Sequence, residues 1–455
     1  MSDSTKSSQL DSATGRGAGE LGSWERIWRF VTVLNLAVRV YAGYKSIQLW
    51  SRWVSKAKAA ERYRRQDLRS ARALLRTAVK LEGLLIKACQ FIATRADVLP
   101  EEWVSTLSVL HDHVPPRSFE MIRAQVEREL GRPLDAIFTA FNRQPIASAS
   151  LAQVHEARLG DGRRCAVKVQ YPGIEARVHA DLRNLMFVLR ILAWMESNFD
   201  FRVVAREMLK YVPMELDFVN EGRNCEQIGR NFATRADVLV PKVYWEFTSR
   251  RVLTMEFMEG LKITELEGTG INRHDVAQKL VEVYCEQILR DGFFQADPHP
   301  GNILVQPGPK LVLLDFGLAK DFPPSFRDGI VRLTLAMLTS DQAGIVRAFG
   351  ELGFKTRDGS LEGMVKVSDL LVGNVVKRGK AYADQDLMQE ISDELPRALR
   401  DNPIVEVPGD ILLVSRVMGL LSGLGKSLDS KVDMMQTMMP YALLGTATKS
   451  RASGE

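Results

Sequence analysis

The stretch FFQADPHPGNILV at 293–305, followed by LVLLDFGLAK at 311–320, decides the fold of this chain. Asp297 and Asn302 lie five residues apart on a segment whose prolines and glycine prevent a continuous helix. Two short apolar runs on either side of a Gln-Pro-Gly-Pro-Lys turn predict a hairpin of two strands. This hairpin would return Asp315 to face Asn302.

These three side chains are of the kinds that phosphoryl transfer requires. Asn302 and Asp315 offer the hard oxygen ligands that Mg²⁺ prefers, and Asp297 is the candidate base that orients or deprotonates a nucleophile. An Asp-Phe-Gly triplet alone is an ordinary strand-end turn, but its spacing from Asp-x-x-x-x-Asn favours a catalytic site. The rest of the chain should then contain a lysine on a strand, a loop that covers phosphates and a helical glutamate.

Composition places the chain among globular proteins of two lobes or two to three domains. It has 455 residues, 45% of them hydrophobic, and its 61 Lys and Arg nearly balance its 56 Asp and Glu. A net charge of +5 is too mild to indicate a nucleic-acid partner. The four cysteines are widely separated, which predicts neither a zinc site nor a disulfide framework and favours a reducing compartment.

The N-terminal part divides into a polar tail and an aromatic, basic segment. Residues 1–23 lack apolar periodicity, so we expect a disordered tail that is neither a secretory signal nor, given its acids, a transit peptide. Charged residues interrupt both 24–50 and 411–447, so no transmembrane helix is expected. Residues 51–76 hold nine Lys or Arg and two acids. The sequence leaves two alternatives open: contact with an anionic membrane surface, or a packed helical extension with a solvated basic face.

Residues 77–142 are predicted to be helical. Apolar residues recur at helical spacing over 81–93, Pro100 suits the start of a second helix, and 118–142 continues the helical pattern. Lys87 and Gln90 lie three apart and therefore share one helical face, which taken alone indicates only an exposed surface.

The next segment contains the expected lysine. A strand over 153–159, a Gly-Asp-Gly turn and a strand over 165–170 form a predicted hairpin, and Lys168 lies inside the second strand. A charged residue in an apolar strand is unfavourable without an anionic partner, and phosphate oxygens with a helical glutamate would supply one. The preceding loop has no Gly-x-Gly-x-x-Gly pattern. Its small residues are the candidates for approaching phosphates with their backbone amides: Ala147, Ser148, Ala149 and Ser150.

Three acids follow a helical segment at 174–199: Glu215, Asp217 and Glu221. They are the nearby candidates for the glutamate that pairs with Lys168. Residues 247–260 are predicted to form a strand and a hinge between lobes, with Glu256 and Met258 in the part where an adenine would bind. A helix over 273–292 then leads to the catalytic loop.

Taken together, these motifs resemble the UbiB (aarF-domain, ADCK-type) atypical kinase-like family over about residues 80–430. The resemblance rests on KACQ at 87–90, TRADVLP at 94–100, PIASASLAQVH at 145–155, AVKV at 166–169, ELDFVNE at 215–221, ADPHPGN at 296–302 and LLDFGLA at 313–319. It implies an α+β, protein-kinase-like bilobal fold with an added helical subdomain that carries a Lys-x-Gly-Gln motif.

The resemblance also implies roles for individual residues. Lys168 matches the nucleotide lysine and Glu221 its partner, Asp297 and Asn302 the catalytic loop, Asp315 the metal ligand, Glu215 and Asp217 a Glu-x-Asp pair, and Lys87 and Gln90 the signature pair. The implied cofactors are ATP and Mg²⁺, and the implied partners are isoprenoid or other lipids at a membrane. Cys89 stands where the family has glycine, which predicts a helix that packs less closely over the active site.

We therefore predict an atypical kinase-like phosphotransferase or ATPase linked to isoprenoid quinone or other lipid metabolism, peripherally bound to a membrane on the cytoplasmic or organelle-matrix side. The alternatives are a small-molecule kinase of the aminoglycoside or choline type and a non-catalytic, nucleotide-sensing lipid chaperone. The predicted organisation is a tail at 1–23, an extension at 24–76, a helical subdomain at 77–142, an N-lobe at 143–258 and a C-lobe at 259–447.

Overall fold

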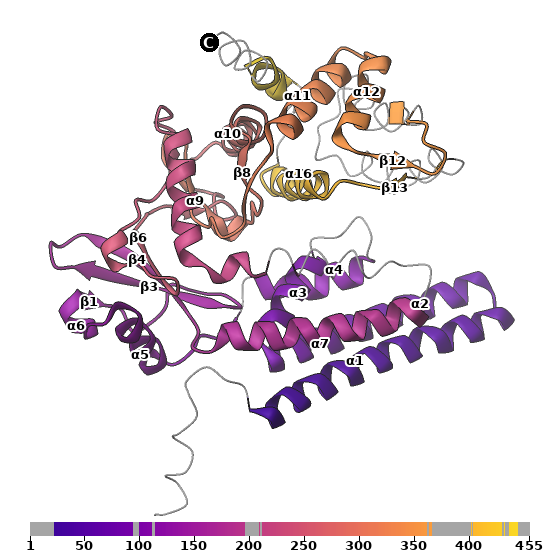
Figure 1. Cartoon of the computed structure of the whole chain (residues 1–455), viewed down its shortest axis with the longest axis horizontal. Coiled ribbons are helices and arrows are strands. Elements are labelled where there is room, and N and C mark those ends of the chain that lie inside the picture. The colour runs from indigo at the N-terminus through magenta and orange to yellow at the C-terminus, as the bar shows by residue number, and fades with distance from the viewer. Residues whose placement is uncertain are drawn as a thin grey trace, which may run out of the picture. The chain divides into compact units, whose positions relative to one another are not determined.

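The computed structural model divides the chain into two compact units (Figure 1). The first consists of 1–219 and 244–256, and the second of 220–243 and 257–455. The structure describes residues 22–93, 100–111, 114–195, 209, 212–361, 364–365, 402, 404–429, 432 and 436–444. The predicted tail up to residue 21 and the motif residues 94–99 lie outside these ranges.

An antiparallel five-stranded sheet organises the first unit, in the order β1-β3-β4-β6 with β2 paired to β3. Its strands are β1 (Phe138–Phe141), β2 (Ala147–Ser148), β3 (Ala152–Leu159), β4 (Arg164–Gln170) and β6 (Val252–Glu256). The predicted hairpin around Gly160-Asp161-Gly162 is confirmed, and Gly162 adopts a φ of +84°, which a residue without Cβ accommodates easily.

Helices form the rest of the first unit. They are α1 (Ser23–Trp50), α2 (Lys56–Leu81), α3 (Leu84–Ala93), α4 (Glu101–Leu107), α5 (Phe119–Leu130), α6 (Leu134–Ile137) and α7 (Ile174–Met195), with the short turns η2 (Ser51–Trp53), η3 (Ser108–His111), η4 (Met214–Leu216) and η5 (Trp245–Phe247). The helix expected over 118–142 ends early, because its last residues form β1 and pair with β3 in the sheet.

The aromatic and basic extension packs onto this helical body. Figure 1 shows α1 lying along α2 and α7, and Arg29 of α1 forms a buried ion pair with Asp181 of α7. Burial, opposed by this arginine, raises the pKa of the Asp181 carboxyl. Helix α2, which contains most of the basic part of this extension, buries Ala71, Ala78 and Leu81, and the last two belong to the core of the helical body, so the packing part of the second alternative is confirmed. Among the described residues, no helix is both long and apolar enough to cross a bilayer.

The second unit is built around a four-stranded sheet in the order β5-β10-β9-β7 and two two-stranded ladders, β11-β8 and β12-β13. The strands are β5 (Val238–Leu239), β7 (Leu261–Lys262), β8 (Phe293–Gln295), β9 (Ile303–Gln306), β10 (Lys310–Leu313), β11 (Ala319–Asp321), β12 (Lys355–Thr356) and β13 (Ile404–Glu406). The helices are α9 (Phe218–Asn231, whose first two residues belong to the first unit), α10 (Arg273–Cys285), α11 (Pro324–Leu338), α12 (Gln342–Leu352) and α16 (Gly409–Ser427).

One departure from the expected pattern leads directly to the catalytic loop. The helix predicted over 273–292 is α-helical only to Cys285, and η6 (Glu286–Asp291) is a π-helical turn that ends at Gly292 with a φ of +67°. Single π turns in α-helices are frequent at functional sites.

Candidate functional site

The predicted hairpin is present and places the backbone of Asn302 beside Leu314, one residue before Asp315. Strands β9 and β10 pair antiparallel with Ile303 opposite Leu313, and the amide of Leu314 donates to the carbonyl of Asn302 at 3.0 Å. Asp315 directly follows this pair, so its carboxylate and the Asn302 side chain start from adjacent positions at the end of one hairpin.

The catalytic loop folds back on its own backbone. The amide of His299 donates to the Asp297 carbonyl at 2.8 Å, and the amide of Asn302 donates to the His299 carbonyl at 2.9 Å. The side-chain nitrogen of Asn302 also donates to the Asp297 carbonyl, at 3.4 Å. With the nitrogen directed there, the amide oxygen of Asn302 is the atom that could coordinate a cation.

The Asp-Phe-Gly turn is stabilised by a hydrogen bond within the turn and by another from α9. The amide of Gly317 donates to Oδ1 of Asp315 at 3.0 Å, and Nδ2 of Asn224 donates to the carbonyl of Phe316 at 3.0 Å. Phe316 is fully buried. Hydrogen bonds therefore fix the turn at two consecutive residues, Asp315 and Phe316. They also constrain the direction of the Asp315 carboxylate.

These groups fit a magnesium ion. A Cβ at Gly317 would lie 3.4 Å from Oδ1 of Asp315 and 3.6 Å from Oε2 of Glu221, so both carboxylates border the same small space. Mg²⁺ is usually held by one or two carboxylates together with substrate phosphates and waters, rather than by a complete protein cage. In the described ranges, no cluster of three His, Cys, Asp or Glu side chains suited to a metal occurs.

Lys168 lies on β4, in the middle of the first unit's sheet. Its register partners are Val154 on β3 and Leu253 on β6, and its own neighbours on β4 are buried valines. The ammonium lies 5.2 Å from the centre of the Phe218 ring, where the ring's negative face attracts a cation. The strand thus carries the lysine on a rigid support, as expected.

The loop of small residues forms a tight hairpin. Ala147 and Ser148 make up β2 and pair with β3, and the amide of Ala149 donates to the Ala152 carbonyl at 2.8 Å. The hydroxyl of Ser148 lies 2.9 Å from that of Tyr171. Ser150 is buried. This hairpin forms without any of the glycines usual in phosphate-covering loops.

Of the two signature residues, Lys87 contacts the predicted Glu-x-Asp pair within the first unit. Nζ of Lys87 forms an ion pair with Glu215 at 2.9 Å, although the two are far apart in sequence. Gln90 instead donates to the Leu110 carbonyl at 2.9 Å, and Oδ1 of Asp217 accepts from the amide of Val219 at 3.0 Å. Thus Lys87 contacts one member of the predicted Glu-x-Asp pair, whereas Gln90 and Asp217 stabilise local backbone.

The predicted nucleotide residues divide between the units. Lys168, the loop at 147–150 and Glu256 belong to the first unit, whereas Glu221, Met258, Asp297, Asn302 and Asp315 belong to the second. Sequence reasoning missed Asn224, Tyr284 and Gln295, which contact the Asp-Phe-Gly turn or each other. The available signal was Gln295 itself, a polar amide between aromatic residues and the catalytic loop.

Comparison with known proteins identifies related chains. The model of the ABC1 atypical kinase-like domain matches residues 109–349. The chain is 31% identical over 422 residues to Protein ACTIVITY OF BC1 COMPLEX KINASE 7, chloroplastic, of Arabidopsis thaliana, covering 91% of this chain and 59% of that protein. It is 37% identical over 294 residues to AarF domain-containing protein kinase 1 of Gallus gallus, covering 63% and 57% respectively.

A solved structure of Rv3197 with erythromycin, from Mycobacterium tuberculosis, has a similar fold. The TM-score is 0.59 at 22% identity, and the match covers 84% of this chain and 97% of that one. The α+β, kinase-like fold expected from the sequence is thereby confirmed.

Proposed function

Since the chain belongs to the ABC1 atypical kinase-like family, we propose that it binds ATP with Mg²⁺ and transfers the terminal phosphoryl group to water or to a small or lipid acceptor. The observation that carries this proposal is the hairpin in which Asn302, at the end of the loop containing Asp297, pairs with Leu314, the residue before Asp315. Phosphoryl transfer needs positioning and charge stabilisation more than covalent chemistry, and these groups are suited to both.

The residues have separate roles in this proposal. Asp315 and the amide oxygen of Asn302 would hold Mg²⁺, which neutralises charge on the phosphates when bound. Asp297 would orient or deprotonate the acceptor hydroxyl. Lys168, with Glu221 as its anionic partner, and the backbone amides of the loop at 147–150 would bind phosphate oxygens. Glu256 and Met258 would lie on the adenine side.

The test is ATP turnover by the purified protein, with and without anionic liposomes. Asp297→Asn should keep nucleotide affinity and lower turnover by about 100-fold, because general-base catalysis contributes roughly 10²–10⁴. Asp321→Asn is the matched control, since this exposed aspartate lies on β11 outside the site. Wild-type protein that binds Mg²⁺-ATP without turnover would instead favour the non-catalytic, nucleotide-sensing alternative.

We also propose that α1 contacts an anionic membrane surface. Its exposed apolar residues recur at helical spacing along one face: Trp24, Ile27, Trp28, Val31, Val38 and Leu49. Exposed basic residues accompany them, among them Arg26, Arg39 and Arg52. Aromatic rings with neighbouring cations suit the interface between lipid headgroups and acyl chains. This location would give access to an isoprenoid quinone or another lipid acceptor.

Vesicle co-sedimentation tests the membrane contact. Replacing Trp24 and Ile27, which are 80% and 55% exposed, with serine should weaken binding to anionic vesicles about tenfold or more, because each buried apolar side chain is worth roughly 1.5–3 kcal/mol. Val405→Ser is the control, since Val405 is also exposed but lies on β13 of the second unit. Binding that is insensitive to both salt and these substitutions would contradict the proposal.

A further inference from the structure

Gln295 connects the strand before the catalytic loop to the Asp-Phe-Gly turn. It is the last residue of β8, fully buried, and two positions before Asp297. Its Nε2 donates to the main-chain carbonyl of Asp315, and its Oε1 accepts from the hydroxyl of Tyr284 at 2.8 Å. One side-chain amide therefore bridges α10 and the residue proposed to hold the metal.

The phenol of Tyr284 determines which way this amide points. The carbonyl of Asp315 can only accept, so it requires the NH₂ group, and the amide oxygen then needs a donor on its other side. Tyr284 supplies that donor. Burial, and next the charge of Asp297, raise the pKa of this phenol well above its usual value, so the hydroxyl stays protonated.

The π-helical turn supplies a second contact to Gln295. Oε1 of Gln287, which lies on η6, accepts from the backbone amide of Gln295 at 2.9 Å. Gln287 is fully buried, and among the described residues its Nε2 has no hydrogen-bond partner. Burying a half-satisfied amide destabilises the fold compared with an apolar residue, so stability alone does not account for glutamine at this position.

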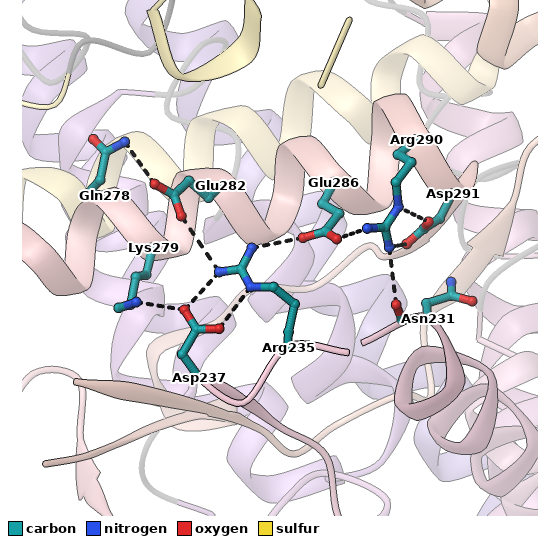
Figure 2. A network of polar contacts seen from close by, with 9 residues as sticks. All are labelled: Asn231, Arg235, Asp237, Gln278, Lys279, Glu282, Glu286, Arg290 and Asp291. Atoms are coloured by element: carbon teal, nitrogen blue, oxygen red, sulfur yellow. Dashed lines mark hydrogen bonds and ion pairs between the residues drawn. The ribbon is translucent and has the colours of Figure 1, made fainter. Parts of the chain in front are cut away.

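Charged residues hold the other side of the π turn (Figure 2). Glu286 is only 3% exposed and accepts from Arg235 at 2.9 Å and from Arg290. Arg290 also donates to Asp291 at 2.6 Å and to the carbonyl of Asn231 at 3.1 Å. These contacts tie Glu286 and Arg290 to α9 and to the segment before β5, and they support the fold of the second unit.

We propose that Tyr284 and Gln287 are positioning residues for phosphoryl transfer, which act through Gln295 to fix the Asp315 peptide relative to Asp297. This inference rests on the function proposed above. Neither residue touches the nucleotide. They set the geometry of the metal ligand, and a shift of a few tenths of an ångström there would weaken metal-dependent chemistry more than it weakens the fold.

Tyr284→Phe tests the inference with minimal change in volume. We expect turnover to fall about tenfold and the Mg²⁺ concentration for half-maximal activity to rise several-fold, because the amide oxygen of Gln295 loses its donor and the amide no longer has one orientation. Tyr441→Phe is the matched control, since its phenol contacts Arg235 of the charged network rather than Gln295. It should leave turnover and the Mg²⁺ requirement unchanged.

A double-mutant cycle identifies the route. In a Gln295→Leu background, Tyr284→Phe should have no further effect on turnover or on the Mg²⁺ requirement, because the bridge is already gone. Additive losses would show that Tyr284 acts by another path and would overturn the proposal. Wild-type kinetics in Tyr284→Phe would overturn it as well.

Hydrogen exchange separates failure of this inference from failure of the proposed function. The segment 311–320 should exchange about tenfold faster in Tyr284→Phe than in wild type or Tyr441→Phe, whether or not the protein turns over ATP. Unchanged exchange would reject the bridge. Absence of Mg²⁺-ATP binding and turnover in wild type would reject the proposed function.

Discussion

The two units hold their functional residues in different ways. In the second unit, the carbonyls of Asp315 and Phe316 accept hydrogen bonds from the side chains of Gln295 and Asn224. The carboxylate of Asp315 accepts from the turn's own amide at Gly317, and the catalytic loop closes on itself. In the first unit, Lys87 forms an ion pair with Glu215, and the two side chains keep 19% and 16% of their exposure. Hydrogen bonds to consecutive residues of a turn define one geometry, whereas a partly exposed ion pair between side chains can break without unfolding its surroundings. We therefore expect the second unit to determine whether phosphoryl transfer occurs, and the Lys87–Glu215 pair to adjust its rate.

Asp315→Asn should have the largest effect, because it removes the carboxylate proposed to hold Mg²⁺ and leaves the ion with less negative charge from the protein. We expect Mg²⁺-dependent nucleotide affinity to fall by about 100-fold or more, equivalent to roughly 3 kcal/mol. Calorimetric titration of ATP with and without Mg²⁺ measures it. The Asp321→Asn variant should titrate like wild type, and an Asp315→Asn variant with full Mg²⁺-ATP affinity would remove Asp315 from the metal site.

How much of the site could be predicted depends on whether its signals are local in the sequence. The Asn302–Asp315 hairpin was predictable, because short apolar runs and a proline-glycine turn are local signals. The Tyr284–Gln295 bridge was not, because it depends on a π turn that changes which helix face meets β8, and local propensity does not encode such a turn. The helix predicted over 118–142 failed at β1 because strand pairing, a non-local interaction, overrode helical spacing.

Lys87→Met should have an intermediate effect. Without its cation, Glu215 no longer fixes the turn η4 that leads into α9, and we expect the KM for ATP to rise about tenfold. Glu215→Gln should behave similarly, and the double variant should be no worse than either single one. Arg64→Met, which removes a 73% exposed cation from its pair with Glu102, is the control and should be neutral. Fully additive effects of the two substitutions would show that the pair does not act as a unit.

Cys89→Gly should change activity less. Cys89 is fully buried against apolar residues of α2, α4 and η3, so its extra volume is accommodated inside the helical body. We expect turnover to change by less than about threefold, while the free energy of unfolding falls by roughly 1–3 kcal/mol through lost burial and helix propensity. Cys89→Ala separates these causes because it retains the Cβ and helix propensity. If Cys89→Gly changes turnover more than Lys87→Met does, packing at Cys89, rather than the ion pair, determines how the first unit affects turnover.

Asp237→Asn should leave activity unchanged and alter only the pH dependence of stability. Arg235 holds the Asp237 carboxylate with two hydrogen bonds of 2.8 and 2.9 Å, and Lys279 adds one of 2.6 Å (Figure 2). The bonds from Arg235, and next those from Lys279, hold the pKa of Asp237 below its usual range. A carboxyl with a lowered folded-state pKa stabilises the protein above its unfolded pKa of about 3.9 and loses that contribution as the pH falls. The difference in urea midpoint between wild type and Asp237→Asn should therefore stay full from pH 7 down to about pH 4 and shrink only as the pH falls further.

Asp291, in the same charged network, provides a control because its pKa shift has the opposite sign to that of Asp237. Burial, opposed by Arg290, raises the pKa of its carboxyl, so the folded protein binds this proton more tightly than the unfolded chain does. As the pH falls, wild type should therefore gain stability relative to Asp291→Asn, whereas it should lose stability relative to Asp237→Asn. If the stability differences between wild type and the two variants both shrink as the pH falls, general acid unfolding accounts for them. The charged network then makes no specific contribution to the pH dependence of stability. Opposite trends with unchanged turnover at pH 7 would show that the charged side of the π turn supports the fold, and that sensitivity of catalysis is confined to the Tyr284–Gln295 side.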